Sequence, residues 1–92
     1  MVNAIVLLKV DRNRINGVAQ ELVAIEGVSE VYSVAGQWDL VAVLRAKDDD
    51  QFADIVTEGM LKVDGIRSSE TLIAFRVLSR YDLDRMFSVG MD

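Results

Sequence analysis

The stretch VSEVYSVAGQWDLVAVLRA, residues 28–46, decides the fold of this chain. Its two ends, residues 28–35 and 39–46, are rich in the valine, leucine and aromatic residues typical of strands. Only Gly36 to Trp38 separate them, and so short a connection favours an antiparallel hairpin over a parallel crossover. The sheet is therefore expected to be antiparallel.

A strand and a helix are predicted before the hairpin. Residues 2–10, VNAIVLLKV, have the composition of a strand. Residues 13–25 carry apolar side chains at helical spacing, and Gly27 supplies a C-terminal stop. The apolar stripe consists of Ile15, Val18, Ala19, Leu22 and Val23.

The same order follows the hairpin. The aspartate run at residues 48–50 precedes a second stripe at helical spacing, Gly65 ends that helix, and residues 66–78 predict a long final strand. Carboxylates at an N-cap and in a first turn complement the helix dipole, so the run needs no metal to explain it. The second stripe consists of Phe52, Ile55, Val56, Met60 and Val63.

A weak internal repeat supports this order. At an offset of 38 residues, Val18, Leu22, Ile25, Gly27 and Val28 fall on Val56, Met60, Val63, Gly65 and Ile66. Two βαβ units with right-handed crossovers predict an α+β, ferredoxin-like βαββαβ fold, a four-stranded antiparallel sheet with two helices on one face. We expect one domain over residues 1–79 and an amphipathic tail over residues 80–92, with Leu83, Met86 and Phe87 on one side.

Composition excludes several classes of protein. A chain of 92 residues is expected to form one core, and the absence of cysteine and histidine excludes disulfides, thiolate nucleophiles, Ser/His/Asp triads and Cys/His zinc sites. We expect no catalytic residue, no metal and no cofactor. A net charge of −5 disfavours a nucleic-acid partner, and no signal peptide or membrane span is recognisable, so a cytoplasmic protein is expected.

Both faces of the predicted sheet look apolar. The first strand has Val6, Leu8 and Val10 on one side and Ile5 and Leu7 on the other; the strands at 39–46 and 66–78 show similar pairs of faces. Two helices cover only one face, so the other is expected to pack against a second copy of the chain in a sheet-to-sheet dimer of the dimeric α/β-barrel type. The alternatives are that some of these residues lie at strand ends or that the tail folds under the sheet as a lid.

Two polar stretches are candidates for a binding site. One is the turn Gly36, Gln37, Trp38 and Asp39, and the other, SSET at residues 68–71, begins the last strand. Both also have ordinary structural explanations, since glycine permits positive φ, aspartate makes Asx-turns, and hydroxyl residues are common on wet strand faces. A tryptophan at a turn tip, however, is typical of an interface.

The segments AGQWDLVAVL, KVDGI and SSETLIAF, in this order and spacing, resemble the effector-binding RAM domain of the Lrp/AsnC (feast/famine) transcriptional regulators. The resemblance covers roughly residues 3 to 78. Trp38 stands where the family has a turn tyrosine, and Ser69 stands where it has a threonine. Family regulators carry a helix-turn-helix before this domain, whereas this chain begins at Met1 on the first strand, so it resembles a stand-alone form.

The resemblance implies a regulatory module that dimerises, assembles into octamers or similar rings and binds an amino acid in clefts between dimers. The ligand-binding residues carried over by position are Gly36, Gln37, Trp38, Asp39, Ser69 and Thr71. Full-length Lrp/AsnC regulators are implied as further partners, with no direct contact to nucleic acid or membrane.

Two other readings stay open. A cofactor-independent dimeric α/β-barrel enzyme, such as a small monooxygenase or isomerase, would enclose polar groups between sheet and helices, where this sequence predicts apolar positions. An ACT-like regulatory domain would differ in strand order and ligand position.

Overall fold

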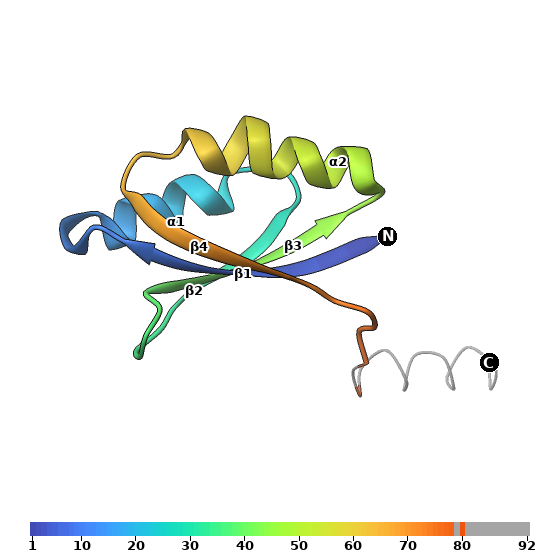
Figure 1. The fold of residues 1–92 in the computed structure, drawn as a ribbon, viewed down its shortest axis with the longest axis horizontal. Coiled ribbons are helices and arrows are strands. Elements are labelled where there is room, and N and C mark those ends of the chain that lie inside the picture. The colour runs from blue at the N-terminus through green and yellow to red at the C-terminus, as the bar shows by residue number, and fades with distance from the viewer. Residues whose placement is uncertain (79, 81–92) are drawn as a thin grey trace.

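A computed structural model describes residues 1–78 and residue 80 of the chain. Its elements follow the predicted order, as Figure 1 shows. They are β1 (Val2–Val10), the 3-10 turn η1 (Arg12–Arg14), α1 (Ile15–Val23), β2 (Val28–Ser33), β3 (Leu40–Ala46), α2 (Asp49–Asp54), the π-helical η2 (Ile55–Gly59), the 3-10 turn η3 (Met60–Lys62) and β4 (Ile66–Ile73).

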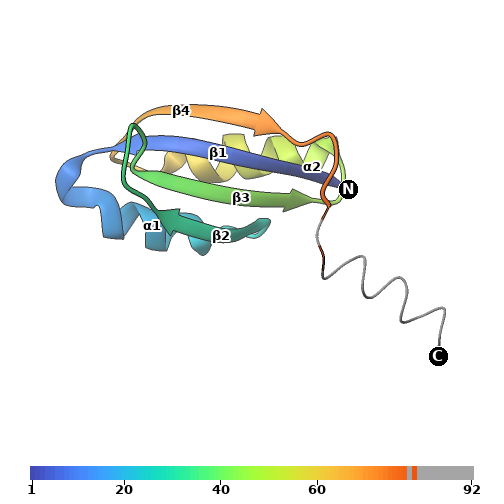
Figure 2. The same cartoon turned by 90° about the horizontal axis from the view of Figure 1, so that it is seen from below.

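The four strands form one antiparallel sheet in the order β2-β3-β1-β4. Figure 2 shows the strands side by side with the helices behind them, and Figure 1 shows all the helices on one face. This arrangement confirms the predicted ferredoxin-like fold. We call the opposite face of the sheet the open face. No helix or strand of the described residues covers it.

The core lies between the sheet and the helices. Alternate residues of β1 and β3 face the helices and are almost fully buried, and Val18 and Leu22 of α1 cover them. Burying a valine or leucine side chain is worth about 1.5–3 kcal/mol, so these apolar positions supply the main driving force for folding. The buried strand residues are Ala4, Val6, Leu8, Val10, Leu40, Ala42, Leu44 and Ala46.

The aspartate run starts the second helix, as predicted. The Asp48 side chain accepts a hydrogen bond of 2.8 Å from the backbone N–H of Gln51. The Gln51 side chain in turn accepts a 2.6 Å bond from the N–H of Lys47, and Asp49 and Asp50 lie in the first turn. Among the described residues, no group of three or more acidic side chains is placed to hold a metal ion.

Gly27 and Gly65 have positive φ, +100° and +104°, at the equivalent positions of the repeat, but they lie in the turns before β2 and β4. The helical segments themselves end earlier, α1 at Val23 and η3 at Lys62. The second segment is not a continuous α-helix, because it passes through π and 3-10 turns between Ile55 and Lys62. Gly59 in the π turn lies so near Ile25 that an added Cβ would be 2.9 Å from the Ile25 Cγ2 atom. The irregular turn thus coincides with a close contact between the two helical segments.

The last strand is shorter than predicted, which corrects the expectation of a strand over 66–78. Ile73 pairs with Ala4, and the N–H of Ala74 donates to the carbonyl of Asn3 at 2.9 Å. Since β1 begins at Val2, almost no partner backbone remains for the residues that follow. Phe75 is consequently fully exposed rather than part of an alternating strand.

The predicted tail at residues 80–92, with Leu83, Met86 and Phe87, lies outside the described residues except for residue 80. Within the part of the chain that the structure describes, no helix is long and apolar enough to cross a membrane.

Candidate functional site

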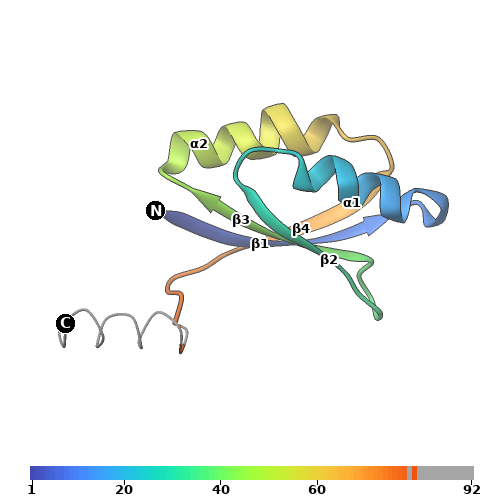
Figure 3. The ribbon, with the colours of Figure 1, turned by 180° about the vertical axis from the view of Figure 1, so that it is seen from behind.

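The turn between β2 and β3 projects from the open face of the sheet, as Figures 1 and 3 show. The backbone N–H of Val34 donates to the carbonyl of Asp39 at 3.0 Å, which closes the turn. Gly36 at its tip has a φ of +135° with open space around it, and Gln37 is exposed. The tip thus leaves backbone groups accessible, as the binding prediction requires.

Asp39 anchors this turn to β1. Its backbone N–H donates to the carbonyl of Leu8 at 2.9 Å, and its carboxylate Oδ2 accepts from the N–H of Val10 at 3.0 Å. The side chain is half-buried. Asp39 therefore has a structural role, but the bond runs to β1, 29 residues away, and is not the Asx-turn considered from the sequence. This bond engages one of the two carboxylate oxygens.

Trp38 lies beside Lys9 on the open face. The Lys9 Nζ atom is 5.6 Å from the centre of the indole ring, within range of a cation–π interaction. Trp38 is half-buried by this arrangement. A flat aromatic wall therefore stands next to Asp39 in the turn.

A cavity of about 450 Å³ opens at this end of the sheet, and we call it the Asp39 cavity. It lies where β1 ends, β4 begins and the turn enters β3. Its volume falls in the range of small-molecule sites. Its lining consists of Lys9, Val10, Arg12, Ile15, Asp39, Arg67 and Ser68.

A β-bulge at Arg67 shapes this cavity. Lys9 pairs with Ser68, but Val10 pairs with Ile66, so Arg67 is an extra residue without a partner on β1. Bulges redirect side chains and are frequent near binding sites. Here the bulge brings Arg67 and Ser68 together in the lining of the cavity.

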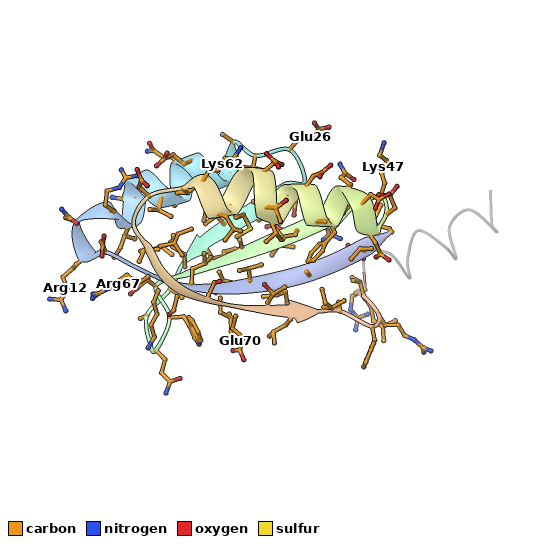
Figure 4. The ribbon with its side chains drawn as sticks, turned by 45° about the horizontal axis from the view of Figure 1, so that its top comes forward. Arg12, Glu26, Lys47, Lys62, Arg67 and Glu70 are labelled. Atoms are coloured by element: carbon orange, nitrogen blue, oxygen red, sulfur yellow. The ribbon has the colours of Figure 1, made fainter. Side chains whose placement is uncertain are left out.

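Positive charge dominates the cavity. Lys9, Arg12 and Arg67 are the cations of its lining, and Asp39 is the only anion there. Figure 4 shows Arg12 and Arg67 near each other at one end of the molecule. The Arg67 Nε atom is 3.7 Å from the Asp11 Oδ1 atom, but both side chains are at least half exposed, so water screens this pair.

Ser69 and Thr71 lie elsewhere. They pair with Leu8 and Val6, whose side chains face the helices, and they line a separate groove of about 120 Å³ between β4 and η2/η3. The expectation that the helix-facing positions are apolar is wrong at these two residues, which stay exposed on edge strand β4 because a groove separates it from η2/η3. Val6, Leu8, Val56, Met60, Leu61, Val63 and Ile66 complete the lining of this β4 groove.

The six predicted site residues therefore do not lie together in one chain. Asp39 lines one cavity, and Ser69 and Thr71 line another, while Gly36, Gln37 and Trp38 belong to the lining of neither. Sequence reasoning missed Lys9, Arg12 and Arg67, and it named Ser68 only as part of a polar stretch. Strict alternation along the last strand would have separated Ser68 from Ser69, but nothing in the sequence pattern marks the bulge.

The open face is apolar along its middle, as predicted for β1 and β3. Ile5 is 40% exposed and Leu72 47%, while Leu7, Val41 and Val43 are half-buried. On β4 this face also carries Ser68 and Glu70. The apolar patch on the open face therefore consists of Ile5, Leu7, Val41, Val43 and Leu72.

A tyrosine borders that patch on edge strand β2. The Tyr32 hydroxyl donates to the Glu30 carboxylate, and this bond to a negative neighbour raises the pKa of Tyr32 above its usual value. The Tyr32 hydroxyl places a polar group at the rim of the patch. No charged or polar residue of the described part of the chain is buried in the core.

Comparison with known proteins reveals a family match. The sequence profile of the Lrp/AsnC ligand binding domain matches residues 3–83. The HTH-type transcriptional regulator FL11 from Pyrococcus furiosus is 30% identical over 77 residues, 80% of this chain and 48% of FL11. An uncharacterised HTH-type transcriptional regulator, PF0250 from the same organism, is 34% identical over 58 residues, 63% of this chain and 39% of its own length. The chain thus spans less than half the length of these curated relatives.

Solved structures show the same domain. The crystal structure of TTHA0845 from Thermus thermophilus has a TM-score of 0.79 at 41% identity, and the match covers 87% of this chain and all of that one. The structure of E. coli AsnC has a TM-score of 0.79 at 18% identity, over 86% of this chain and 54% of AsnC, and shows a shared fold.

Proposed function

This chain belongs to the Lrp/AsnC ligand-binding domain family, and from that premise we propose that it is a regulatory module that binds a free amino acid and modulates transcriptional regulators. The observation that carries the proposal is the placement of Asp39. Its carboxylate lines a cavity of about 450 Å³ and uses Oδ2 to hold the backbone of Val10. The Oδ1 atom is left to accept from a ligand ammonium.

The rest of the turn fits the two other parts of an amino acid. Open backbone around Gly36 can meet polar ligand groups without side-chain obstruction. The Trp38 ring, held beside Lys9, can form a wall for the ligand. Ammonium, carboxylate and side chain therefore each have a candidate partner within residues 36–39 and the cavity lining.

The predicted site residues fall into two separate groups in one chain, and this separation supports a ligand cleft between subunits. Asp39 faces one cavity, whereas Ser69 and Thr71 face the β4 groove on the helix side. A single small ligand would touch both sets only where two copies of the chain meet, one presenting its turn and the other its β4. We propose this shared cleft as the complete site.

Self-association through the open face is part of the same proposal. The residues that the structure describes do not cover the apolar patch, and a second sheet is its simplest cover. The turn projects from this same face, so packing of two sheets would bring the turn close to another subunit. Further assembly into a ring, with or without full-length regulators, would then bring turns and β4 grooves together.

One observation favours the enzyme alternative. The Ser69 and Thr71 hydroxyls stand between sheet and helices, where a dimeric α/β-barrel enzyme would hold its substrate. The remaining lining of the β4 groove is apolar, and none of its residues can act as a base. A regulatory role therefore accounts better for this arrangement.

A thermal-shift screen of the intact oligomer against the twenty amino acids tests the proposal. A ligand present at 100 times its Kd stabilises the folded state by about 2.7 kcal/mol, which is readily measured. We expect one amino acid or a small chemical group of them to raise the melting temperature. No shift with any amino acid at 10 mM would contradict the proposal, because even a ligand with a Kd of about 1 mM would then stabilise the folded state by about 1.4 kcal/mol.

A further inference from the structure

We propose that the ligand of the Asp39 cavity is a small acid with two carboxylates, an inference that rests on the binding role proposed above and names the ligand class. The argument begins with the charges of the lining. The lining contains three cationic residues, Lys9, Arg12 and Arg67, and one anionic residue, Asp39. The lining therefore carries an excess of two positive charges.

Counting Asp11, the acidic neighbour that pairs with a residue of the lining, reduces the excess from two positive charges to one. Asp11 is 3.7 Å from Arg67, with the two side chains 50% and 72% exposed. Such a pair is weak and screened, and it leaves the other guanidinium nitrogens of Arg67 free to contact a ligand. The Lys9 Nζ atom lies 5.6 Å from the centre of the Trp38 ring, a contact that involves no acidic group.

The bulge supports a binding role for Arg67. A regular strand would pair Arg67 with β1, whereas the extra residue places its side chain in the cavity lining beside Ser68. Arg12 reaches the same lining from η1, and Figure 4 shows the two arginines near each other. Two guanidinium groups from separate elements suit two carboxylates, because each can bind a carboxylate in bidentate fashion.

The three ligand classes then differ in how well they match the lining. A neutral amino acid has a single carboxylate and leaves cations without a partner. A basic amino acid adds a like charge to a cavity that is already positive. An acidic amino acid places its ammonium on Asp39 and its two carboxylates on the cations, while a dicarboxylic acid without an amine uses the cations alone.

Matched ligand pairs test the inference by isothermal titration calorimetry on the intact oligomer. L-aspartate is compared with L-asparagine, and L-glutamate with L-glutamine, because each pair has the same shape and differs by one charge. Succinate and glutarate provide the two carboxylates without the ammonium. We expect at least one acid to bind tenfold or more tightly than its amide, and its affinity to fall as salt rises.

Variants locate the effect. Arg12→Gln and Arg67→Gln are each expected to weaken the acid tenfold or more while the oligomer mass stays unchanged. Lys47→Gln is the matched control, since it removes one positive charge from an exposed residue at the other end of the molecule, visible in Figure 4. Asp39→Asn should weaken binding of an amino diacid but not of a dicarboxylate, because only the amino diacid has an ammonium group to contact Asp39.

The outcomes separate this inference from the proposed function. If a neutral amino acid binds as tightly as the acids and depends on Asp39, the preference for diacids is wrong and the amino-acid site stands. If dicarboxylates bind and no amino acid does, the acid-binding cavity stands and the amino-acid function falls. If neither class binds, or if Lys47→Gln weakens the acid as much as the two arginine variants do, the inference is overturned.

Discussion

The Asp39 carboxylate accepts a 3.0 Å hydrogen bond from the backbone N–H of Val10 and at the same time lines the cavity at the end of the sheet. One side chain therefore joins the β2–β3 turn to the end of β1 and presents a charge to solvent. Stability and binding can be separated at this position, because an amide can replace the acceptor but not the charge.

Asp39→Asn is expected to fold and to lose ligand. The amide carbonyl of the new side chain would still accept from Val10, at a cost of up to about 1 kcal/mol because bonds to charged groups are stronger. Affinity for an amino acid should fall by about 1.5–3 kcal/mol, roughly ten- to more than a hundredfold. Calorimetry with the amino acid found by screening measures this loss, and unchanged affinity would move the site away from the turn.

Asp39→Ala supplies the contrasting variant. It leaves the Val10 N–H without its acceptor, which costs about 1–3 kcal/mol if water does not replace it. Urea unfolding should therefore show Asp39→Ala to be less stable than Asp39→Asn. Equal stabilities would mean that the hydrogen bond to Val10 contributes little.

Leu7→Glu should break the assembly. Leu7 lies in the middle of the open face, half-buried in one chain, and burying a carboxylate there against a second sheet is strongly unfavourable. Sedimentation equilibrium should give a mass well above a dimer for the native chain. This mass should change little in 0.5 M salt, because salt screens charge pairs but leaves apolar burial intact. The Leu7→Glu mass should be smaller.

Val23→Glu is the control for that variant, because Val23 is 50% exposed on α1, on the helix side of the molecule. It adds the same charge without touching the open face. Loss of assembly in both variants, or in neither, would argue against a sheet-to-sheet interface.

Asp48→Ala should destabilise the chain by about 0.5–2 kcal/mol, since it removes the side-chain bond to the Gln51 N–H at the start of α2. Asp48→Asn should recover most of this loss because asparagine is an equally good N-cap. Chemical unfolding followed by circular dichroism compares the two. An effect of similar size from Asp50→Ala would assign the stabilisation to dipole charge rather than to the cap.

Gly27→Ala should cost more than Gly36→Ala. Both positions have positive φ, but a Cβ on Gly27 would clash with the Ile55 Cδ1 atom, whereas nothing lies within 4 Å of one on Gly36. Backbone strain alone is worth about 1–2 kcal/mol, so Gly36→Ala should lose about this much and Gly27→Ala clearly more. Thermal unfolding at equal concentration ranks the two, and equal losses would show that Ile55 relocates without cost.

Local sequence patterns determined most of the fold. The strand composition and short connection of residues 28–46, the stripes that include Val18 and Ile55, and the glycines at 27 and 65 are all local signals. Such signals can be read from the sequence because each depends only on residues that are close together in the chain. The motif AGQWDL likewise located the turn that carries Asp39.

Tertiary structure alone decided where the elements end and which polar residues meet. The partner strand β1 stops β4 at Ile73, and the bulge opposite Lys9 and Val10 turns Arg67 and Ser68 toward Asp39 while Ser69 faces the helices. Both effects arise from hydrogen bonding between strands more than 50 residues apart, since Lys9 pairs with Ser68. Side-chain periodicity within one strand carries no information about where its partner ends or skips a residue.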